Sequence, residues 1–569
     1  MTTFTQRLLD IYRADPDRIA IHFIQGNLPD KAISYAELLR NSLGYAQQLT
    51  GAGIRPGEVV ILILQHSQAL LYAFFGAILA GAIPSIMPFL TEKLSPDQYR
   101  RSLAALFEIT APTAVITYPD FFPEVQQAVK SAPSVRCVID SAQIEAPLDF
   151  DAAHLPGLGR APADIVLLQH SSGTTGLQKG VALSHQAVFN QLENYSKAIA
   201  FSRSDVVVSW LPLYHDMGLI AGFIMPVLCQ APLVLMSPFD WVRSPHRLLA
   251  AVSTYHGTLS WLPNFAYNFC AQKIRDRDLE GVDLSSWRAV INCSEPMYFH
   301  SHQQFLERFR PYTLPPTALA TCYAMAENVF AVSQGGIDAP VTVDRIRADV
   351  FTSQHIAQPA REGEPTINML SAGRPIQNTR LRILDKRYHE LPDRHIGEVA
   401  ILSDCMLSGY YQRPDLTAKS FHDGWYLTGD LGYLADGEIY ITGRKKDLII
   451  VGGKNIYPQD LENLASEVPG VHAGRVAAFG IYNDRAGTED VVIIAEAGGE
   501  QTHQNEVELS QEQQQEIADT IRQHITKNSD IALRFVKVVE RGWLIKTSSG
   551  KVARSANREK YLLENIDQG

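Results

Sequence analysis

Ten residues, from Ser171 to Gly180, combine the side chains and the backbone freedom that phosphate binding needs. The run contains four hydroxyl residues, three glycines and one lysine, in the order Ser171-Ser172-Gly173-Thr174-Thr175-Gly176-Leu177-Gln178-Lys179-Gly180. Glycines let successive backbone N–H groups point at one closely approaching ligand, the hydroxyls add donors, and Lys179 adds positive charge. A triphosphate fits this set of donors. The run is not a Walker loop, because no Lys-Ser or Lys-Thr pair follows its glycines.

A flexible Ser/Gly linker is the alternative explanation of this composition. The flanking residues argue against it, because Ile165–Leu168 and Val181–Leu183 are apolar runs typical of buried strands. Ser184 follows as the expected cap of a helix that starts near Gln186. The pattern therefore favours a phosphate-binding loop between two strands.

His215 and Glu327 are polar residues beside apolar segments. His215 could stand at the mouth of an apolar substrate pocket, although a strand end with a satisfied histidine is the simpler alternative. Glu327 follows the mostly apolar segment Thr321–Ala326 and is costly to bury unpaired. Either a magnesium ion near phosphates or a structural salt bridge would compensate its charge.

Three later residues extend the set of candidates. Asp430 lies in a glycine-bounded turn, where its carboxylate can accept bonds from two ribose hydroxyls, and Arg444 can donate to the same sugar. Lys551 belongs to the basic segment Lys546–Arg554, which charge alone would explain as a solvated turn. Each of these signals is weak by itself.

The elements that position these residues follow an alternating strand–helix pattern, which indicates an α/β fold. Ser34 and Glu37 form a capping box for a helix that ends at Gly51. The run from Val59 to Thr91 has no charged residue and is long enough to span a membrane, but its glycines and prolines divide it. We therefore expect a buried β-α-β unit there, and no transmembrane helix.

Two other stretches carry expectations about regular structure. The apolar run 217–239 is expected to divide in the same way, at Pro226 and Pro232. The stretch 335–365 has weak periodicity, and regular structure is expected to resume at 380–385.

Composition limits the class of protein. The chain has 569 residues, of which 46% are hydrophobic and 20% charged, as in an ordinary globular protein of three or four domains. A net charge of −11 argues against nucleic acid as the main partner. The six cysteines lack paired spacing, which argues against a disulfide framework or a zinc site and favours thiols in a reducing cytoplasm. The first ten residues contain no apolar core of signal-peptide length.

Taken together and in this order, these segments resemble the adenylate-forming superfamily, which includes acyl-CoA synthetases, luciferases and peptide-synthetase adenylation domains. The motifs that carry the resemblance are the phosphate loop, Tyr323…Glu327, Tyr426…Asp430, Gly443-Arg444 and Lys551. The resemblance implies an α/β fold in two parts. A large N-terminal domain, residues 1–445, would bind ATP and the acyl group. A small mobile C-terminal domain, residues 446–569, would carry the catalytic lysine and rotate about a hinge at Lys446.

The resemblance also implies roles at the phosphate end of the site. Thr174 and Thr175, with the amides of the loop, would hold the β- and γ-phosphates of ATP. Glu327, together with Thr174, would hold Mg²⁺. The remaining loop residues assigned to ATP are Ser171, Ser172, Gly173, Gly176 and Lys179.

At the nucleoside end, the resemblance assigns the ribose to Asp430 and Arg444. The adenine would lie against Tyr323 and the segment Ser294-Glu295-Pro296. Lys551 would bridge the substrate carboxylate and the α-phosphate, and we count His215 with Lys551 and Glu327 among the candidate catalytic residues. Bringing two anions together makes catalysis mainly a matter of positioning and charge neutralisation.

Within the superfamily, the chain resembles fatty-acyl-AMP ligases, which pass acyl adenylates to carrier proteins. The likeness lies in segments 210–220, 263–267 and 457–460. It also lies in the distance along the chain from Glu327 to Gly373, a separation of 46 positions. This is about two dozen more than in ordinary CoA ligases, where so long a connection would be uncommon. The resemblance implies that this insertion, near 335–365, restricts the small domain and suppresses reaction with CoA.

Some residues depart from the ligase pattern. The pair Gly452-Gly453 is more like that of CoA ligases, Ser294 and Ala324 replace an expected alanine and glycine, and Asn328 replaces a small residue beside Glu327. These changes could reshape the acyl pocket.

The sequence thus predicts ATP-dependent activation of a carboxylic, fatty acid to an acyl adenylate, followed by transfer to an acyl carrier protein. An acyl-CoA ligase with CoA as acceptor is the nearest alternative. An amino-acid adenylation domain is less favoured, because Tyr214-His215-Asp216 stands where those enzymes use a different motif. A non-catalytic nucleotide-binding regulator is disfavoured, because it would need neither Glu327 nor Lys551.

Overall fold

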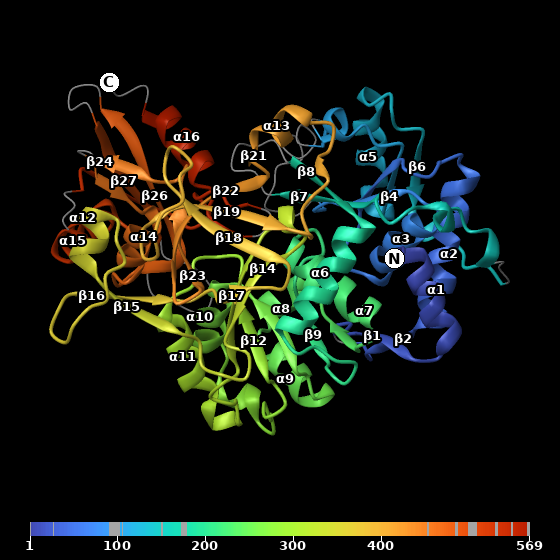
Figure 1. The fold of residues 1–569 in the computed structure, drawn as a ribbon, viewed down its shortest axis with the longest axis horizontal. Coiled ribbons are helices and arrows are strands. Elements are labelled where there is room, and N and C mark those ends of the chain that lie inside the picture. Colours follow the sequence, from blue (N-terminus) through green and yellow to red (C-terminus); the bar gives the residue numbers. More distant parts are fainter. Residues whose placement is uncertain are drawn as a thin grey trace.

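The computed structural model describes most of the chain (Figure 1). The described residues are 2–26, 28–89, 103–104, 106–148, 152–171, 179–451, 454–483, 488–498, 509–529, 533–547 and 550–565. Residues 172–178, the centre of the predicted phosphate loop, lie outside them, as does the pair Gly452-Gly453.

A nine-stranded sheet, in the order β17-β14-β13-β12-β11-β9-β10-β1-β2, forms the centre of the larger part of the molecule. The neighbours from β1 through β10, β9, β11 and β12 to β13 are all parallel, so their carboxyl ends meet at one edge. The strands are β1 (Ile19–Phe23), β2 (Lys31–Ser34), β9 (Val207–Ser209), β10 (Leu233–Leu235), β11 (Leu259–Leu262), β12 (Ala289–Asn292), β13 (Leu319–Ala324), β14 (Ala331–Gly335) and β17 (Arg374–Pro375).

The predicted β-α-β unit is confirmed. Strands β3 (Val59–Ile63) and β4 (Ile83–Ile86) are parallel, and the buried helix α3 (Gln68–Leu79) connects them. With β5 (Ala114–Thr117) and β6 (Cys137–Asp140) they form a second parallel sheet, in the order β4-β3-β5-β6. Within the part of the chain that the structure describes, no helix is long and apolar enough to cross a membrane.

Helix α2 (Tyr35–Gly51) packs closely on α3. A Cβ atom at Gly76 of α3 would lie 2.5 Å from the Cβ of Tyr45 and 2.6 Å from the carbonyl oxygen of Ser42, so only glycine fits there. Ser34 accepts the bond from the N–H of Glu37, as predicted. The reciprocal half of the capping box differs, because the Glu37 carboxylate pairs with Lys31 at 2.5 Å and accepts from Tyr72.

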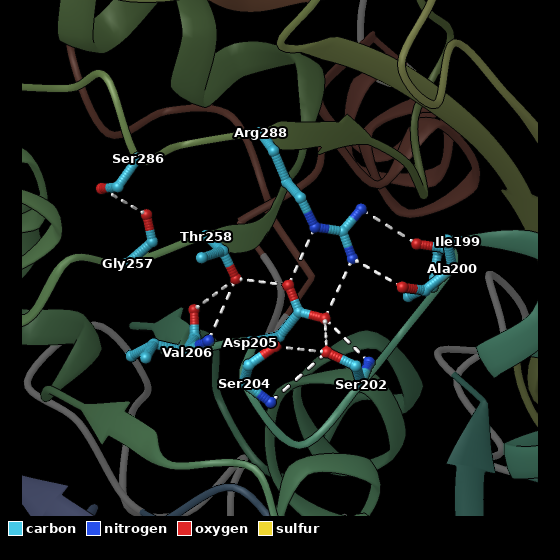
Figure 2. A network of polar contacts seen from close by, with 10 residues as sticks. All are labelled: Ile199, Ala200, Ser202, Ser204, Asp205, Val206, Gly257, Thr258, Ser286 and Arg288. Carbon is cyan, nitrogen blue, oxygen red and sulfur yellow. Dashed lines mark hydrogen bonds and ion pairs between the residues drawn. The ribbon is translucent and has the colours of Figure 1, made fainter.

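A buried ionic network fixes the amino ends of the central strands (Figure 2). Asp205 receives two bonds from the guanidinium of Arg288, at 2.8 and 3.0 Å, and one from the hydroxyl of Thr258 at 2.8 Å. Arg288 also donates to the carbonyls of Ile199 and Ala200. Burial raises the pKa of Asp205, but these bonds outweigh it and hold the pKa below its ordinary value. The network joins the segments before β9, β11 and β12 at the edge opposite the carboxyl ends.

The apolar run 217–239 differs from its prediction at one proline. Met217–Ile224 is a π-helix that leads directly into α7 (Met225–Cys229). Pro226 lies in the first turn of α7 and does not interrupt the run. Pro232 does separate α7 from β10, as expected.

Two antiparallel sheets complete the larger part. One has the order β20-β8-β7, and the other β18-β19-β22-β21 with β23 paired to β22. Ser184 caps α6 (His185–Ala198), accepting from the N–H of Ala187 at 3.1 Å, as predicted. The strands are β7 (Ile165–Ser171), β8 (Lys179–Ser184), β18 (Thr379–Leu384), β19 (Gly397–Ser403), β20 (Gly409–Tyr410), β21 (Phe421–His422), β22 (Trp425–Ala435) and β23 (Glu438–Arg444).

The stretch 335–365 has more regular structure than its weak periodicity indicated. Strand β15 (Val343–Arg347) pairs with β16 (Thr366–Leu370), and α12 (Ala348–Gln354) lies between them. Asp344 anchors β15, accepting from Arg394 and from the hydroxyl of Tyr433, both at 2.9 Å. These partners are 50 and 89 residues away, so local periodicity carries no sign of them.

The elements after residue 448 lie together at one end of the molecule, orange to red in Figure 1. They are β24 (Ile449–Val451), β25 (Lys454–Ile456), α14 (Pro458–Ser466), β26 (Val471–Asn483), β27 (Thr488–Ala497), α15 (Gln511–Asn528), β28 (Phe535–Val539) and α16 (Arg554–Asn565). They bury two apolar clusters of their own. The division between residues 445 and 446 stays a prediction.

Candidate functional site

The two ends of the predicted phosphate loop are held together. Ser171 at the end of β7 pairs with Lys179 at the start of β8, so the intervening residues connect two antiparallel strands. The Lys179 ammonium lies 4.9 Å from the ring centroid of Tyr410. The five predicted ligands Ser172, Gly173, Thr174, Thr175 and Gly176 lie outside the described residues, so their roles stay predictions.

Glu327 lies on the same side, in the short 3₁₀ turn Ala326–Asn328 after β13. Its Oε1 accepts a 2.9 Å bond from the hydroxyl of Tyr410, which also contacts the hydroxyl of Tyr426 at 2.9 Å. Burial, with Glu327 nearby, raises the pKa of Tyr410, so its phenol keeps the proton that it donates. Glu327 and Lys179 thus share Tyr410 as a neighbour.

Asp430 forms the centre of a second cluster. It is buried in β22, and the hydroxyl of Tyr323 donates to its Oδ2 at 2.6 Å. Arg444, directly opposite on β23, lies 3.1 Å from Oδ1. The carboxylate of Asp430 raises the pKa of Arg444. An aromatic hydroxyl, a carboxylate and a guanidinium therefore converge where the resemblance assigns a nucleoside.

Lys551 reaches this region from the far end of the chain. Its ammonium donates to the carbonyl oxygen of Ser294, in the turn after β12. Ser294 has a φ of +70°, which is in the left-handed region of backbone conformation. The neighbouring Glu295 accepts from the N–H of Phe265 at 3.0 Å. Pro296 is exposed.

His215 is half-buried and lies within the electrostatic influence of the same lysine, while its place at the mouth of a pocket stays a prediction. Its Nε2 is buried and has no hydrogen-bond partner among the described residues. Burial, and then the charge of Lys551, lower the pKa of His215 to about 3, so the imidazole is neutral. Burial raises the pKa of the adjacent Asp216, which caps the π-helix through the N–H of Met217 at 2.8 Å.

A hairpin positions Lys551. The N–H of Thr547 donates to the carbonyl of Lys551 at 2.7 Å, and Gly550 turns the chain with a φ of +82°. The buried side chain of Asn557 clamps the base of this hairpin: its Oδ1 accepts from the N–H of Ile545, and its Nδ2 donates to the carbonyls of Ile545 and Ala553, all at 2.8 to 2.9 Å.

Lys446, the predicted hinge, is exposed in the turn between β23 and β24. The guanidinium of Arg554, the first residue of α16, donates at 2.8 Å to the carboxylate of Asp447, the residue after Lys446. Its other nitrogens bind both oxygens of Glu462 on α14, at 2.7 and 2.6 Å. The turn after Lys446 is therefore tied to the segment that carries Lys551.

Three residues of the site were missed from the sequence. They are Tyr410 beside Glu327, Asn557 beneath Lys551, and Gln169 of β7, whose Nε2 donates to the carbonyl of Tyr214 at 2.8 Å. No motif distinguishes them, because each acts on a partner remote in sequence or on backbone atoms.

The donor set agrees with a magnesium ion that depends on its nucleotide. Among the described residues, no three His, Cys, Asp or Glu side chains gather to hold a metal. Mg²⁺ in nucleotide sites typically takes one or two carboxylates and completes its shell with phosphates and water. Glu327 can supply such a carboxylate, since its Oε2 accepts no hydrogen bond within the described part of the chain.

Comparison with known proteins agrees with this geometry. The chain is 30% identical to a long-chain-fatty-acid–AMP ligase of Mycobacterium bovis, covering 96% of each. It is 29% identical to a medium-chain-fatty-acid–acyl-carrier-protein ligase of Moorena producens, covering 97% of this chain and 93% of that one. A solved structure from a study of the fatty acyl-adenylate ligases of E. coli and L. pneumophila superposes with a TM-score of 0.88 at 27% identity, over 100% and 99% of the two chains. The profile of the family described as AMP-binding enzyme matches residues 10–411, and the chain belongs to that family of adenylate-forming enzymes.

Proposed function

We propose that the protein activates a fatty acid with ATP and passes the acyl group to the phosphopantetheine thiol of an acyl carrier protein. The observation that carries the proposal is the meeting of Lys551 with Ser294 beside the neutral His215. The cluster of Tyr323, Asp430 and Arg444 supports a nucleoside next to that lysine.

In the first step, a carboxylate oxygen of the acid attacks the α-phosphorus of ATP. The new O–P bond makes an acyl adenylate, and the bond to the bridging oxygen breaks to release pyrophosphate. The ammonium of Lys551 would stabilise the charge on the reacting oxygens, and neutral His215 would border the acyl group without adding charge. Asp430 and Arg444 would hold the ribose, and Ser294-Glu295-Pro296 with Tyr323 would hold the adenine.

Mg²⁺, when bound, supplies neutralisation of the phosphate charges. Glu327 and Thr174 would hold it, while Tyr410 orients the Glu327 carboxylate by its 2.9 Å bond. Lys179 and the loop amides would contact the outer phosphates.

In the second step, the carrier thiolate attacks the acyl carbonyl and AMP leaves. The contact between the insertion and the C-terminal elements supports a carrier protein over free CoA: the ring of Phe351 on α12 lies 5.8 Å from that of Tyr457. The Moorena relative is named for such a carrier. All six cysteines are free thiols, which supports a reducing cytoplasm as its location.

The test is exchange of labelled pyrophosphate into ATP, with Mg²⁺ and a panel of acids of increasing chain length. We expect exchange that depends on an apolar acid. Absence of exchange with every acid would refute the enzymatic proposal. Acyl-CoA formation by the intact protein at many turnovers would instead make it an acyl-CoA ligase.

A further inference from the structure

Two segments that follow neighbouring strands lie side by side at the carboxyl edge of the central sheet. Strands β11 and β12 are parallel, with Leu262 opposite Asn292. Helix α10 (Asn264–Lys273) begins after β11, and the turn 293–298 follows β12 and leads into α11 (Phe299–Phe309). The start of α10 belongs to segment 263–267, in which the sequence resembles fatty-acyl-AMP ligases and to which the proposed reaction gives no role.

The side chain of Asn264 bonds to both ends of the turn 293–298. Its Oδ1 accepts from the Nδ2 of Asn292 at 3.0 Å and from the N–H of Tyr298 at 3.2 Å. Asn292 directly precedes the turn and Tyr298 is its last residue, so one oxygen atom joins the two ends. The Nδ2 of Asn264 donates to the hydroxyl of Ser301 on α11 at 3.2 Å, which fixes the orientation of the amide. Asn264 is only 5% exposed and Asn292 is fully buried, and in such a low-dielectric interior a hydrogen bond is stronger than in water.

The amide of Asn292 is held from a second side. Its Nδ2 lies 3.0 Å from the Nε2 of His302 on α11. Burial lowers the pKa of His302 to about 4, so the ring is neutral and its Nε2 can accept the second amide hydrogen. The ring of Tyr267 on α10 stacks on His302 at 5.1 Å, and its hydroxyl donates to the carbonyl of Val290 at 2.9 Å. Asn292 therefore presents its amide to Asn264 in one orientation.

The start of α10 also holds the middle of the turn. The N–H of Phe265 donates to the carboxylate of Glu295 at 3.0 Å. Pro263 is the N-cap of α10 and makes no side-chain capping bond, so Glu295 caps the helix from outside, at the end where its dipole favours negative charge. Two successive residues of α10, Asn264 and Phe265, thus restrain the turn at three points.

Ser294 is the residue of the turn whose backbone depends most on this restraint. A φ of +70° is uncommon for a residue with a side chain, and it persists where the surrounding structure over-determines it. The carbonyl of Ser294 accepts from the ammonium of Lys551. Without the bonds of Asn264, Ser294 could relax to a commoner conformation, and its carbonyl would move. The place at which Lys551 is bound would move with it.

We propose that Asn264 is a positioning residue of the adenylation step, because it closes the turn 293–298 and so places both Lys551 and the adenine. The inference rests on the proposed function, which assigns Lys551 to the reacting oxygens and the turn to the adenine. Asn264 bonds to the turn and to α11, and it acts on the reaction through the turn alone.

The test measures kcat and KM in the pyrophosphate exchange assay with dodecanoate. In Asn264→Ser the shorter side chain cannot reach both donors. We expect kcat to fall by about tenfold or more, since small misplacements of reacting groups are costly. The KM for ATP should rise by about threefold or more, the scale of one lost hydrogen bond, while the KM for the acid stays close to that of the wild type.

Two further variants of α10 complete this comparison. Asn264→Asp keeps an oxygen for the two donors, and the hydroxyl of Ser301 can donate to its other oxygen, so it should recover most of kcat and of the KM for ATP. Asn268→Ser is the matched control, one turn further along the helix. The Oδ1 of Asn268 is buried and bonds to no described residue, so this variant should keep the wild-type constants.

A double-mutant cycle with Lys551→Ala separates positioning from a purely structural role. If Asn264 acts through Lys551, the loss of kcat caused by Asn264→Ser should be much smaller in Lys551→Ala than in the wild type. A residue that only supports folding would lower the active fraction, with the same loss of kcat in both backgrounds and the KM for ATP unchanged. Equal losses, an unchanged KM for ATP, or no recovery in Asn264→Asp overturns the inference.

The remaining outcomes keep this inference apart from the proposed function. If Asn264→Ser does not fold, Asn292→Ser breaks the same bond from β12 and is held to the same criteria. Exchange with no acid by the wild type overturns the ligase proposal. Calorimetric titration with ATP and Mg²⁺ then still tests the turn: weaker binding by Asn264→Ser than by the wild type and Asn268→Ser supports its positioning by Asn264, and equal binding by all three refutes it.

Discussion

At the scale of single residues, Lys551 has the clearest separable role. Its ammonium donates to the carbonyl of Ser294 and affects the titration of both His215 and Asp216, so it stands among the groups that would surround the acyl carboxylate. A carboxylate and an α-phosphate that approach each other need a cation between them, and Lys551 would provide one. The thiol transfer joins no second phosphate and has no such need.

We therefore expect Lys551→Ala to lower adenylation by at least about a hundredfold, on the order of 3 kcal/mol in activation free energy. Transfer from a supplied acyl adenylate to the carrier thiol should persist, because the proposed rotation of the small domain would turn Lys551 away for that step. Pyrophosphate exchange and single-turnover transfer measure the two steps. Lys546→Ala, five residues earlier in the same hairpin, is the control and should keep both rates. An equal loss of both rates in Lys551→Ala would contradict this role.

The charged candidates could be predicted from the sequence, but the residues that contact them could not. Lys551, Glu327, Asp430 and Arg444 stand in motifs, and the structure places them beside Ser294, Tyr410 and one another, while their roles stay predictions. Tyr410 bonds to Glu327 across 83 residues, a separation that no local pattern spans. Its role depends on the pairing of β20 with β8, which only the folded chain reveals.

At the scale of elements, the insertion is the feature on which the proposed choice of a carrier protein over CoA rests. Asp344 holds β15 against Arg394 and Tyr433, while Phe351 on α12 reaches Tyr457 in front of α14. The insertion thus contacts both the larger part of the molecule and the elements beyond the predicted hinge. Such a contact would favour one orientation of residues 447–569 over the others.

Shortening the insertion should release this restraint. We expect a variant that lacks most of 340–362 to form acyl-CoA faster than the wild type at saturating CoA, with pyrophosphate exchange retained. Phe351→Ala, which leaves the β15–β16 pairing in place, should shift in the same direction by a smaller factor. The measurement is acyl-CoA by mass spectrometry, against Val350→Ala on the same helix as the control. Unchanged CoA use in both variants would argue against a restraint by the insertion.

Elements with strong local signals were predicted well, and those that depend on remote partners were not. Strands β3 and β5 and helix α3 are so apolar that their sequences predict buried elements. Strand β15 alternates poorly, with Val343, Asp344 and Arg345 at its start, because Asp344 is paired inside the fold instead of pointing to solvent. Pro226 does not interrupt the helical run, contrary to the prediction, because it lies in the first turn of α7. At that position a backbone N–H would have no partner within the helix, so proline loses no hydrogen bond.

At the scale of the whole molecule, buried neutral histidines set how stability depends on pH. Burial lowers the pKa of five of them, to about 3 for His215 and about 4 for the others. The five are His66, His170, His185, His215 and His302. In His185 the Nδ1 lone pair accepts from the N–H of Phe4 at 3.2 Å, a bond that a protonated ring would lose.

The sign of the effect follows from proton linkage. An unfolded histidine titrates near pH 6.5, whereas these five stay neutral in the fold down to about pH 4. Between those values the unfolded chain binds more protons, so the free energy of unfolding falls as the pH is lowered from about 6.5 toward 4. Asp460 acts in the opposite direction, because burial raises its pKa to about 7, but it is one carboxyl against five histidines, and most other carboxylates titrate below about pH 5. The upper half of this window therefore belongs mainly to the histidines. We expect the urea midpoint to be level between pH 8 and 7 and to fall steadily from pH 6.5 to 5.5. His170→Gln, at a site with both ring nitrogens unpaired in the described structure, should make that fall shallower, while His389→Gln at an exposed site should not. A urea midpoint that stays constant from pH 7 to 5.5 would show that the buried histidines are protonated in the folded protein as readily as in the unfolded chain.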